Sequence, residues 1–282
     1  MVAVRAWPPP WAMLAAPMPH TAATSALSSP KTAPTPARAL LLAAGRGERM
    51  RPLTDHLPKP LLAVHGKPLL QWQVEALAAG GFGEVVANTA WLGEKIEQHF
   101  GSALRYSHEG QDFGFALETA GGISRALPLL ADVFWVAAGD VYAPDFVFGA
   151  DAVRRFQASS MLAHLWLVPN PEHNPRGDFG LDGATGLALN LPPSPAQPDT
   201  ARWTYSTIGL YRNALFFPPW TDIPPGNPQG RKAALAPLLR AAMDHGRVSA
   251  ELYTGHWTDV GTPHRLEQLN AGLPLSTQPR PT

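Results

Sequence analysis

A glycine-rich, basic segment near residue 45 has the residue types of a phosphate-binding loop. The apolar run 39–44 (ALLLAA) predicts a buried strand, and the segment 45–49 (GRGER) follows it directly. Glycine allows a tight turn and lets backbone N–H groups approach a phosphate without obstruction by Cβ. The pattern therefore predicts a phosphate site at the carboxyl end of this strand.

Two common phosphate-binding motifs do not fit this loop. A dinucleotide fingerprint requires a third glycine where this chain has Met50, and no acidic residue stands at the ribose position after the next predicted strand. A P-loop requires Gly-Lys-Ser/Thr, whereas Gly66-Lys67 is followed by Pro68. What remains is a longer string, 42–54 (LAAGRGERMRPLT), followed by 58–61 (PKPL).

The elements that must position this loop alternate between helix and strand patterns. Pro68 opens a helical pattern that ends before Gly80-Gly81, which predicts a helix over 68–79, and 84–89 (EVVANT) predicts the next strand. A right-handed β–α–β crossover implies a parallel sheet. The alternation continues with helices at 93–100, 119–130 and 150–157 and strands at 103–108, 133–138 and 161–168.

The second half of the chain has a mixed pattern. Strands are predicted at 178–182, 186–190, 202–211, 248–253 and 256–260, and helices at 235–244 and 263–271. Ligands of open α/β sheets bind at the carboxyl ends of the strands. We therefore predict an α/β fold with a Rossmann-like, mixed but mostly parallel sheet flanked by helices.

Composition excludes several classes of function. The chain of 282 residues has 22 basic and 22 acidic residues, so no overall field attracts nucleic acid or an anionic membrane. It has no cysteine, which excludes disulfides, thiolate nucleophiles and Cys-based metal sites. No apolar run reaches the ~18 residues of a membrane helix. We expect a soluble, cytoplasmic protein that binds neither nucleic acid nor a membrane.

Proline and charge distributions indicate the domain boundaries. Eight prolines lie in the first 36 residues, and no acidic residue precedes Glu48. We expect a flexible tail at 1–37, a single folded domain at 38–272 and a C-terminal tail at 273–282. For the first tail, a targeting peptide and an upstream start codon are alternative interpretations.

The string at 42–54 and 58–61 resembles the signature of the sugar-1-phosphate nucleotidyltransferases, or nucleoside-diphosphate-sugar pyrophosphorylases, LAAGxGxRMxPxT followed by PKPL. The resemblance extends to 138–140 (AGD) and 256–262 (HWTDVGT) and covers about 39–270. It implies the nucleotide-diphospho-sugar transferase fold. It also implies an enzyme that binds an NTP and a sugar 1-phosphate and forms an NDP-sugar and pyrophosphate by Mg-assisted in-line attack.

Other segments look most similar to one group in this family, the uridylyltransferases that act on N-acetylmuramic acid 1-phosphate in peptidoglycan recycling. These segments are 88–93 (NTAWLG), 117–123 (LETAGGI), 170–173 (NPEH) and 177–179 (GDF). Mannose-1-phosphate guanylyltransferases and glucose-1-phosphate thymidylyl- or uridylyltransferases are the alternatives, and a non-catalytic nucleotide-sugar sensor is a different class of alternative. Ala138 stands where close relatives commonly have Asn, and so lacks a side-chain amide near the ribose or sugar. The identities of the nucleotide base and of the sugar therefore stay open. We expect a monomer, with an oligomer as the alternative.

The resemblance implies roles for individual residues. Arg49 would clamp the departing β,γ-phosphates, and Lys59 would place a charge between the α-phosphate and the sugar phosphate. The implied nucleotide-binding residues are Ala43, Ala44, Gly45, Arg46, Gly47, Lys59, Gly121 and Gly122, and the implied sugar-binding residues are Glu118, Asn170 and Asp178.

Two aspartates complete the implied site. Asp140 follows the predicted strand 133–138, and Asp259 lies in another predicted strand-end motif, so both can converge at the carboxyl edge of one sheet. Their hard oxygen ligands suit a partly hydrated Mg²⁺ ion that bridges phosphate oxygens. For a Gly-Asp pair after a strand, a turn or a helix cap is the alternative interpretation.

Overall fold

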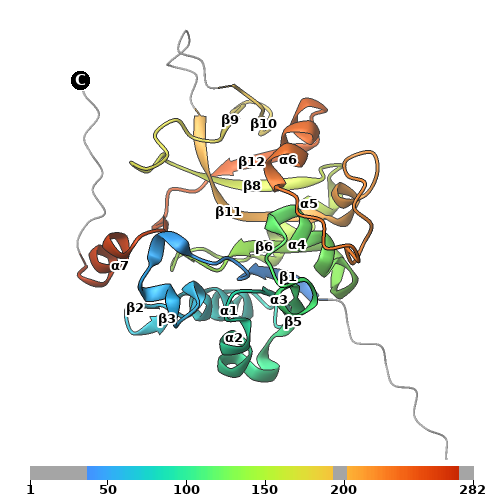
Figure 1. Ribbon diagram of the computed structural model, residues 1–282. Helices are drawn as coiled ribbons and strands as arrows, with labels where there is room; N and C mark the ends of the chain where they lie inside the picture. The colour runs from blue at the N-terminus through green and yellow to red at the C-terminus, as the bar shows by residue number, and fades with distance from the viewer. Residues whose placement is uncertain (1–36, 193–201, 273–282) are drawn as a thin grey trace, which may run out of the picture. The chain divides into compact units, whose positions relative to one another are not determined.

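The structure is a computed structural model that describes residues 37–192 and 202–272 (Figure 1). The tails expected at 1–37 and 273–282 lie outside the described residues, except for Ala37, which begins strand β1 (Ala37–Leu42). None of the helices in the described ranges has the length and apolar character of a membrane span.

A nine-stranded mixed sheet forms the centre of the fold. Parallel strands at one end follow the order β5, β4, β1, β6; antiparallel β11 then joins β6 to β8, and β12 pairs parallel with β8. Short strands β9 and β10 extend from β11. The bounds are β4 Val85–Thr89, β5 Arg105–His108, β6 Leu130–Ala138, β8 Ala163–Val168, β9 Phe179–Leu181, β10 Ala188–Leu189, β11 Arg202–Arg212 and β12 Val248–Leu252.

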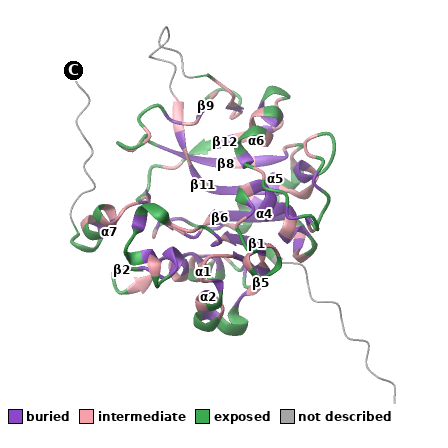
Figure 2. Ribbon diagram, viewed as in Figure 1, coloured by how far each residue is buried: buried purple, intermediate pink, exposed green. Residues whose placement is uncertain are grey.

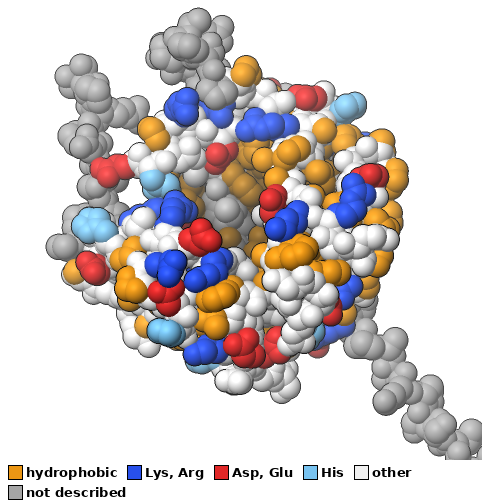
Figure 3. Space-filling view, in the orientation of Figure 1, with side chains coloured by type: hydrophobic (Ala, Val, Ile, Leu, Met, Phe, Trp, Pro, Cys, Tyr) orange, Lys and Arg blue, Asp and Glu red, His pale blue; other side chains and the backbone are white. Residues whose placement is uncertain are grey.

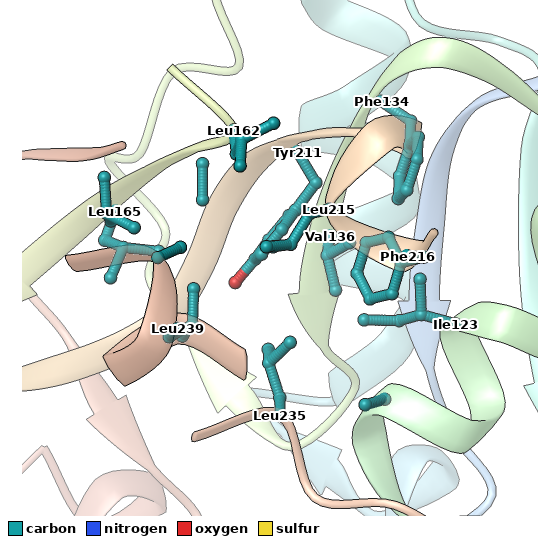
Figure 4. Close-up of a cluster of buried hydrophobic side chains, with 14 of the residues drawn as sticks. Ile123, Phe134, Val136, Leu162, Leu165, Tyr211, Leu215, Phe216, Leu235 and Leu239 are labelled. Atoms are coloured by element: carbon teal, nitrogen blue, oxygen red, sulfur yellow. The ribbon is translucent and has the colours of Figure 1, made fainter. Parts of the chain in front are cut away.

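Helices cover both faces of this sheet, because side chains of successive strand residues point to opposite faces. Leu40 of β1 packs in a cluster with side chains of α4 (Glu118–Ala126) and α6 (Leu235–Asp244). Figure 4 draws part of this cluster. Leu41 packs in the opposite cluster with α1 (Leu69–Ala79), α2 (Gly93–Phe100) and α5 (Ala150–Ala158). Figure 2 shows the buried strands between these more exposed helices. The predicted α/β class and its mixed, helix-flanked sheet are confirmed.

A third, smaller cluster lies beside the sheet. It is built on the hairpin β2 (Ala63–Val64) and β3 (Lys67–Pro68), on strand β7 (Val141–Tyr142), which pairs antiparallel with β13 (Thr258–Asp259), and on α7 (Pro263–Asn270). Asp259 therefore lies in a separate two-stranded sheet and not at the end of a strand of the main sheet. The remaining helix, α3, spans Glu109–Phe113.

The predicted helix over 119–130 is shorter in the structure. It ends at Ala126 and continues as a single 3-10 turn over Leu127–Leu129, followed by β6. Pro128 explains this end, because proline lacks the N–H that the next helical turn would require and its ring clashes with the preceding turn. Conversely, Pro68 directly precedes the first helical residue of α1.

Candidate active site

A cavity of about 880 Å³ opens at the carboxyl ends of β1, β4 and β6. Figure 3 shows this face of the molecule hollowed near its centre, with basic and acidic side chains around the hollow. On one side the glycine-rich loop lines the cavity, and on the other β9, β11 and α6 do. The residues implied by sequence that line it are Ala43, Ala44, Gly45, Gly47, Arg49, Lys59, Glu118, Asp140 and Asp178.

Gly47 gives the loop its shape. Its φ is +65°, in the left-handed region, and a Cβ built there would lie 3.1 Å from Thr54 Cγ2 and 3.2 Å from Lys59 Cβ. The Thr54 hydroxyl donates to the carbonyl oxygen of Gly47 at 2.8 Å. A side chain at this position would therefore strain the backbone and disturb Lys59.

Arg46 braces this loop and does not line the cavity. Its guanidinium lies over the Trp91 ring, 3.5 Å from the ring centroid, and donates to the carbonyl oxygen of Thr54 at 3.0 Å. A second nitrogen lies 3.4 Å from Asp55 Oδ1. The structure thus ties the side chain of Arg46 to the segment behind the loop, and only its backbone remains near the cavity-lining glycines.

Lys59 and Arg49 supply positive charge beside the loop. Lys59 has an exposed fraction of 9%, and its Nζ donates to Asp140 Oδ2. Arg49 is exposed, and among the described residues no carboxylate oxygen lies within 4 Å of its guanidinium. A polyanion that enters the cavity would therefore meet one fixed ammonium and one guanidinium with free donors.

Asp140 and Asp259 lie on neighbouring segments. Val260 N donates to the carbonyl oxygen of Asp140 at 2.9 Å, and Asp259 pairs with Val141 across β7 and β13. Asp259 itself is not among the cavity-lining residues, although Gly261 is. Its carboxylate contacts Arg265 Nη1 at 2.5 Å and His173 Nε2 at 2.9 Å. Burial of the ring lowers the pKa of His173.

The donor chemistry of these two aspartates fits Mg²⁺. Both are hard oxygen ligands, and their side chains are partly exposed, 31% for Asp140 and 21% for Asp259. Within the described ranges no group of three or more His, Asp or Glu side chains could hold a metal by itself. An ion here would complete its coordination with water and phosphate oxygens, as Mg²⁺ usually does in phosphoryl-transfer sites.

Asn88 and Glu109, which the sequence reasoning missed, join β4 and the segments that follow β1 and β5 to the residue that precedes α4. Asn88 Oδ1 accepts from Ala43 N at 2.7 Å, and Asn88 Nδ2 donates to Glu109 Oε1 at 2.6 Å. Glu109 Oε2 accepts from Leu117 N at 2.7 Å. Glu109 is fully buried, and this burial raises the pKa of its carboxyl. Both residues lie at the carboxyl ends of parallel strands, which is the sequence signal that could have found them.

Gly121 and Gly122 allow close packing and do not line the cavity. A Cβ on Gly122 would lie 2.5 Å from Glu109 Oε1 and 2.9 Å from Asn88 Nδ2. A Cβ on Gly121 would lie 2.5 Å from the carbonyl oxygen of Arg231. These glycines therefore let α4 approach the polar network and the 231–233 segment, whereas Glu118, at φ +60°, lines the cavity itself.

On the opposite wall, a network of polar side chains holds the 170–178 loop against β11. Asp178 lines the cavity, and its carboxylate accepts from Tyr205 N at 2.9 Å and from Asn174 Nδ2 at 3.2 Å. Asn170 does not line the cavity; its Nδ2 donates to the carbonyl oxygen of Arg202 at 2.9 Å. Thr207 lines the cavity and lies at a bulge in β11, with a φ of +63°. Its buried hydroxyl has no partner among the described residues.

We expect Glu109→Ala to lower the free energy of unfolding by about 2–4 kcal/mol, because it leaves two buried N–H donors, on Asn88 and Leu117, without acceptors. Urea unfolding measures this change. Glu75→Ala is the matched control, since among the described residues that exposed carboxylate contacts only Lys67 and Gln71, and its effect should stay within about 0.5 kcal/mol. Equal effects of the two substitutions would show that the network does not stabilise the fold.

Comparisons with known proteins show which proteins this chain resembles. The model of the nucleotidyl transferase family matches residues 38–274. The chain is 44% identical over 247 residues to N-acetylmuramate alpha-1-phosphate uridylyltransferase of Neisseria meningitidis serogroup B, covering 83% of this chain and 97% of that protein. It is 37% identical over 240 residues to a UTP–glucose-1-phosphate uridylyltransferase of Synechocystis, covering 79% of this chain and 60% of that protein.

A similar fold is found among solved structures. A crystal structure of a Bacillus anthracis protein, described as a glucose-1-phosphate thymidylyltransferase in complex with sucrose, superposes with a TM-score of 0.67. The match covers 86% of this chain and 98% of that one at 18% sequence identity. At this identity the likeness shows that the two chains share a fold.

Proposed function

The chain belongs to the nucleotidyl transferase family, and we propose that it transfers UMP from UTP to N-acetylmuramic acid α-1-phosphate and releases pyrophosphate. The observation that carries the choice of substrates is the similarity to the Neisseria uridylyltransferase, which extends over almost the whole of that protein. The product would be a nucleotide sugar for the cell wall. Because UTP is a cytoplasmic metabolite, the proposal places the enzyme in the cytoplasm.

The reaction joins two polyanions, so catalysis depends on positioning and on charge neutralisation. The backbone N–H groups of the 45–47 segment and the Arg49 guanidinium are suited to bind the β,γ-phosphates that leave as pyrophosphate. Lys59 lies under the same loop with its ammonium at Asp140. There it can stabilise the charge that develops on the α-phosphate as the sugar phosphate attacks in line.

We further propose that Asp140 and Asp259 hold a catalytic Mg²⁺ ion. The chemistry that the ion would supply there is neutralisation of part of the phosphate charge. In this arrangement Lys59 would position the carboxylate of Asp140, and Arg265 and His173 would position that of Asp259, through the contacts described above. A monomer suffices for the proposed chemistry, because one chain provides all of these residues.

A panel of nucleoside triphosphates crossed with sugar 1-phosphates tests the proposed substrates. We expect pyrophosphate release to have its highest kcat/KM with UTP and N-acetylmuramic acid 1-phosphate. GTP with mannose 1-phosphate, and dTTP or UTP with glucose 1-phosphate, represent the alternative enzymes. A higher kcat/KM for any of those pairs would replace the proposed substrates and leave the reaction class intact.

A further inference from the structure

Helix α6 places one cation on the cavity wall opposite the glycine-rich loop. Of the residues that the structure describes, three basic ones line the cavity: Arg49 and Lys59 lie at the loop, and Arg240 lies on α6. We propose that Arg240 binds a carboxylate on the sugar substrate and so makes the enzyme selective for an acidic sugar 1-phosphate. This inference rests on the proposed function, in which the sugar carries a lactyl carboxylate.

The surrounding residues fix the guanidinium of Arg240 on this wall. Its Nη1 donates to Asn190 Oδ1 at 2.9 Å, and the amide nitrogen of Asn190 donates to Asp244 at 3.0 Å and 3.2 Å. The guanidinium carbon also lies 5.2 Å from the ring centroid of Phe179, another cavity-lining residue. These contacts occupy one of its five N–H donors and orient the others.

Asp178 is a carboxylate on this wall, but the basic side chains here form no ion pair with the described residues. None of their carboxylate oxygens lies within 4 Å of the guanidinium of Arg240 or of nearby Arg202. Arg202 donates to backbone carbonyl oxygens, including those of Gly177 and Asp178, at 2.9 Å each. Its burial and the charge of Arg240 lower the pKa of Arg202. An anion placed at Arg240 would therefore meet two positive charges against the one negative charge of Asp178, and Arg240 supplies free donors.

The position on the wall matches the sugar and not the phosphates. The phosphates of both substrates must meet beside Lys59 and Asp140, and the nucleotide approaches along the glycine-rich loop. The sugar is then left with the wall of β9, β11 and α6, where Asp178, Thr207 and Arg240 provide polar groups. A neutral hexose would leave the guanidinium without an anionic partner, whereas a lactyl ether would supply one.

Two sugars that differ only in this group test the proposal. N-acetylglucosamine 1-phosphate lacks the lactyl carboxylate of N-acetylmuramic acid 1-phosphate and is otherwise the same. For Arg240→Met, we expect the preference for the muramic substrate, as a ratio of kcat/KM values, to fall about 10- to 100-fold, as the loss of a charge-assisted hydrogen bond predicts. The KM for UTP should change little, and Arg240→Lys should restore part of the preference.

Thermal melting of each variant checks that it is folded, and Arg154→Met, which removes an exposed arginine of α5, is the matched control. For the Arg240 variant, an equal loss of kcat/KM for both sugars, or an unchanged preference, would overturn the role of Arg240. The proposed function would still stand if the wild-type enzyme prefers the muramic substrate. A wild-type enzyme that does not use the muramic substrate would overturn both.

Discussion

Lys59→Met should lower kcat by about 10²- to 10³-fold, the effect of removing one preorganised group that stabilises charge in a transition state. Among the described cations that line the cavity, Lys59 is the least exposed, and its ammonium lies beside Asp140, where the proposed reaction puts the α-phosphate. Methionine keeps an unbranched apolar side chain against Gly47 but removes the charge. The KM values should change far less than kcat, because the interaction strengthens in the transition state.

Single-turnover pyrophosphate release measures the loss at Lys59, and thermal melting measures the stability of the variant. Lys67→Met is the matched control, because Lys67 pairs with Glu75 outside the cavity, and its kcat should stay within about twofold of wild type. A Lys59 variant that keeps wild-type kcat would contradict the catalytic role. A loss of activity that follows a loss of folded protein would assign Lys59 to stability instead.

Asp140→Asn and Asp259→Asn should each lower turnover by about 100-fold or more, equivalent to ~3 kcal/mol of lost transition-state stabilisation. Each change preserves shape and removes one negative charge, so Mg²⁺ affinity should fall while the fold survives. The double variant should be little worse than either single one, because residues that act as a unit give non-additive losses. Excess chelator should abolish activity of the wild type, and added Mg²⁺ should restore it.

Rates of the two single variants, the double variant and Asp151→Asn decide this assignment. Asp151 is an exposed residue of α5 that pairs with Arg154, so its substitution should leave turnover unchanged. Multiplication of two modest effects in the double variant would mean that the aspartates act independently. The shared metal site would then have to be abandoned.

Local sequence patterns were sufficient to predict most of the elements. The helices at 93–100 and 235–244 agree with the structure at both ends, because an apolar face repeats along each and a glycine or polar segment follows it. The pairing of distant strands was not predictable in the same way. Antiparallel β11 lies between β6 and β8, which are distant from it in sequence. The separate pair of β7 with β13 joins residues more than a hundred positions apart.

The candidate site was predictable where the chain carries a continuous motif. The loop 43–49 and Lys59 come together because the strand before them and the short connection fix their positions. Asn88, Glu109 and Arg240 were missed because each is a single polar residue whose importance arises from tertiary neighbours. The resemblance implied that Gly121 and Gly122 bind the nucleotide, whereas in the structure both are buried in α4, where a Cβ would meet neighbouring groups.

The fate of the α-phosphate tests the central claim most directly. The purified protein is incubated with Mg²⁺, N-acetylmuramic acid 1-phosphate and UTP labelled in the α-phosphate, and the products are separated and identified by mass. We predict that the label enters UDP-N-acetylmuramic acid and that one pyrophosphate forms for each labelled nucleotide sugar. Label that remains in UTP, or that appears in UMP or UDP without any nucleotide sugar, would contradict the proposed transfer.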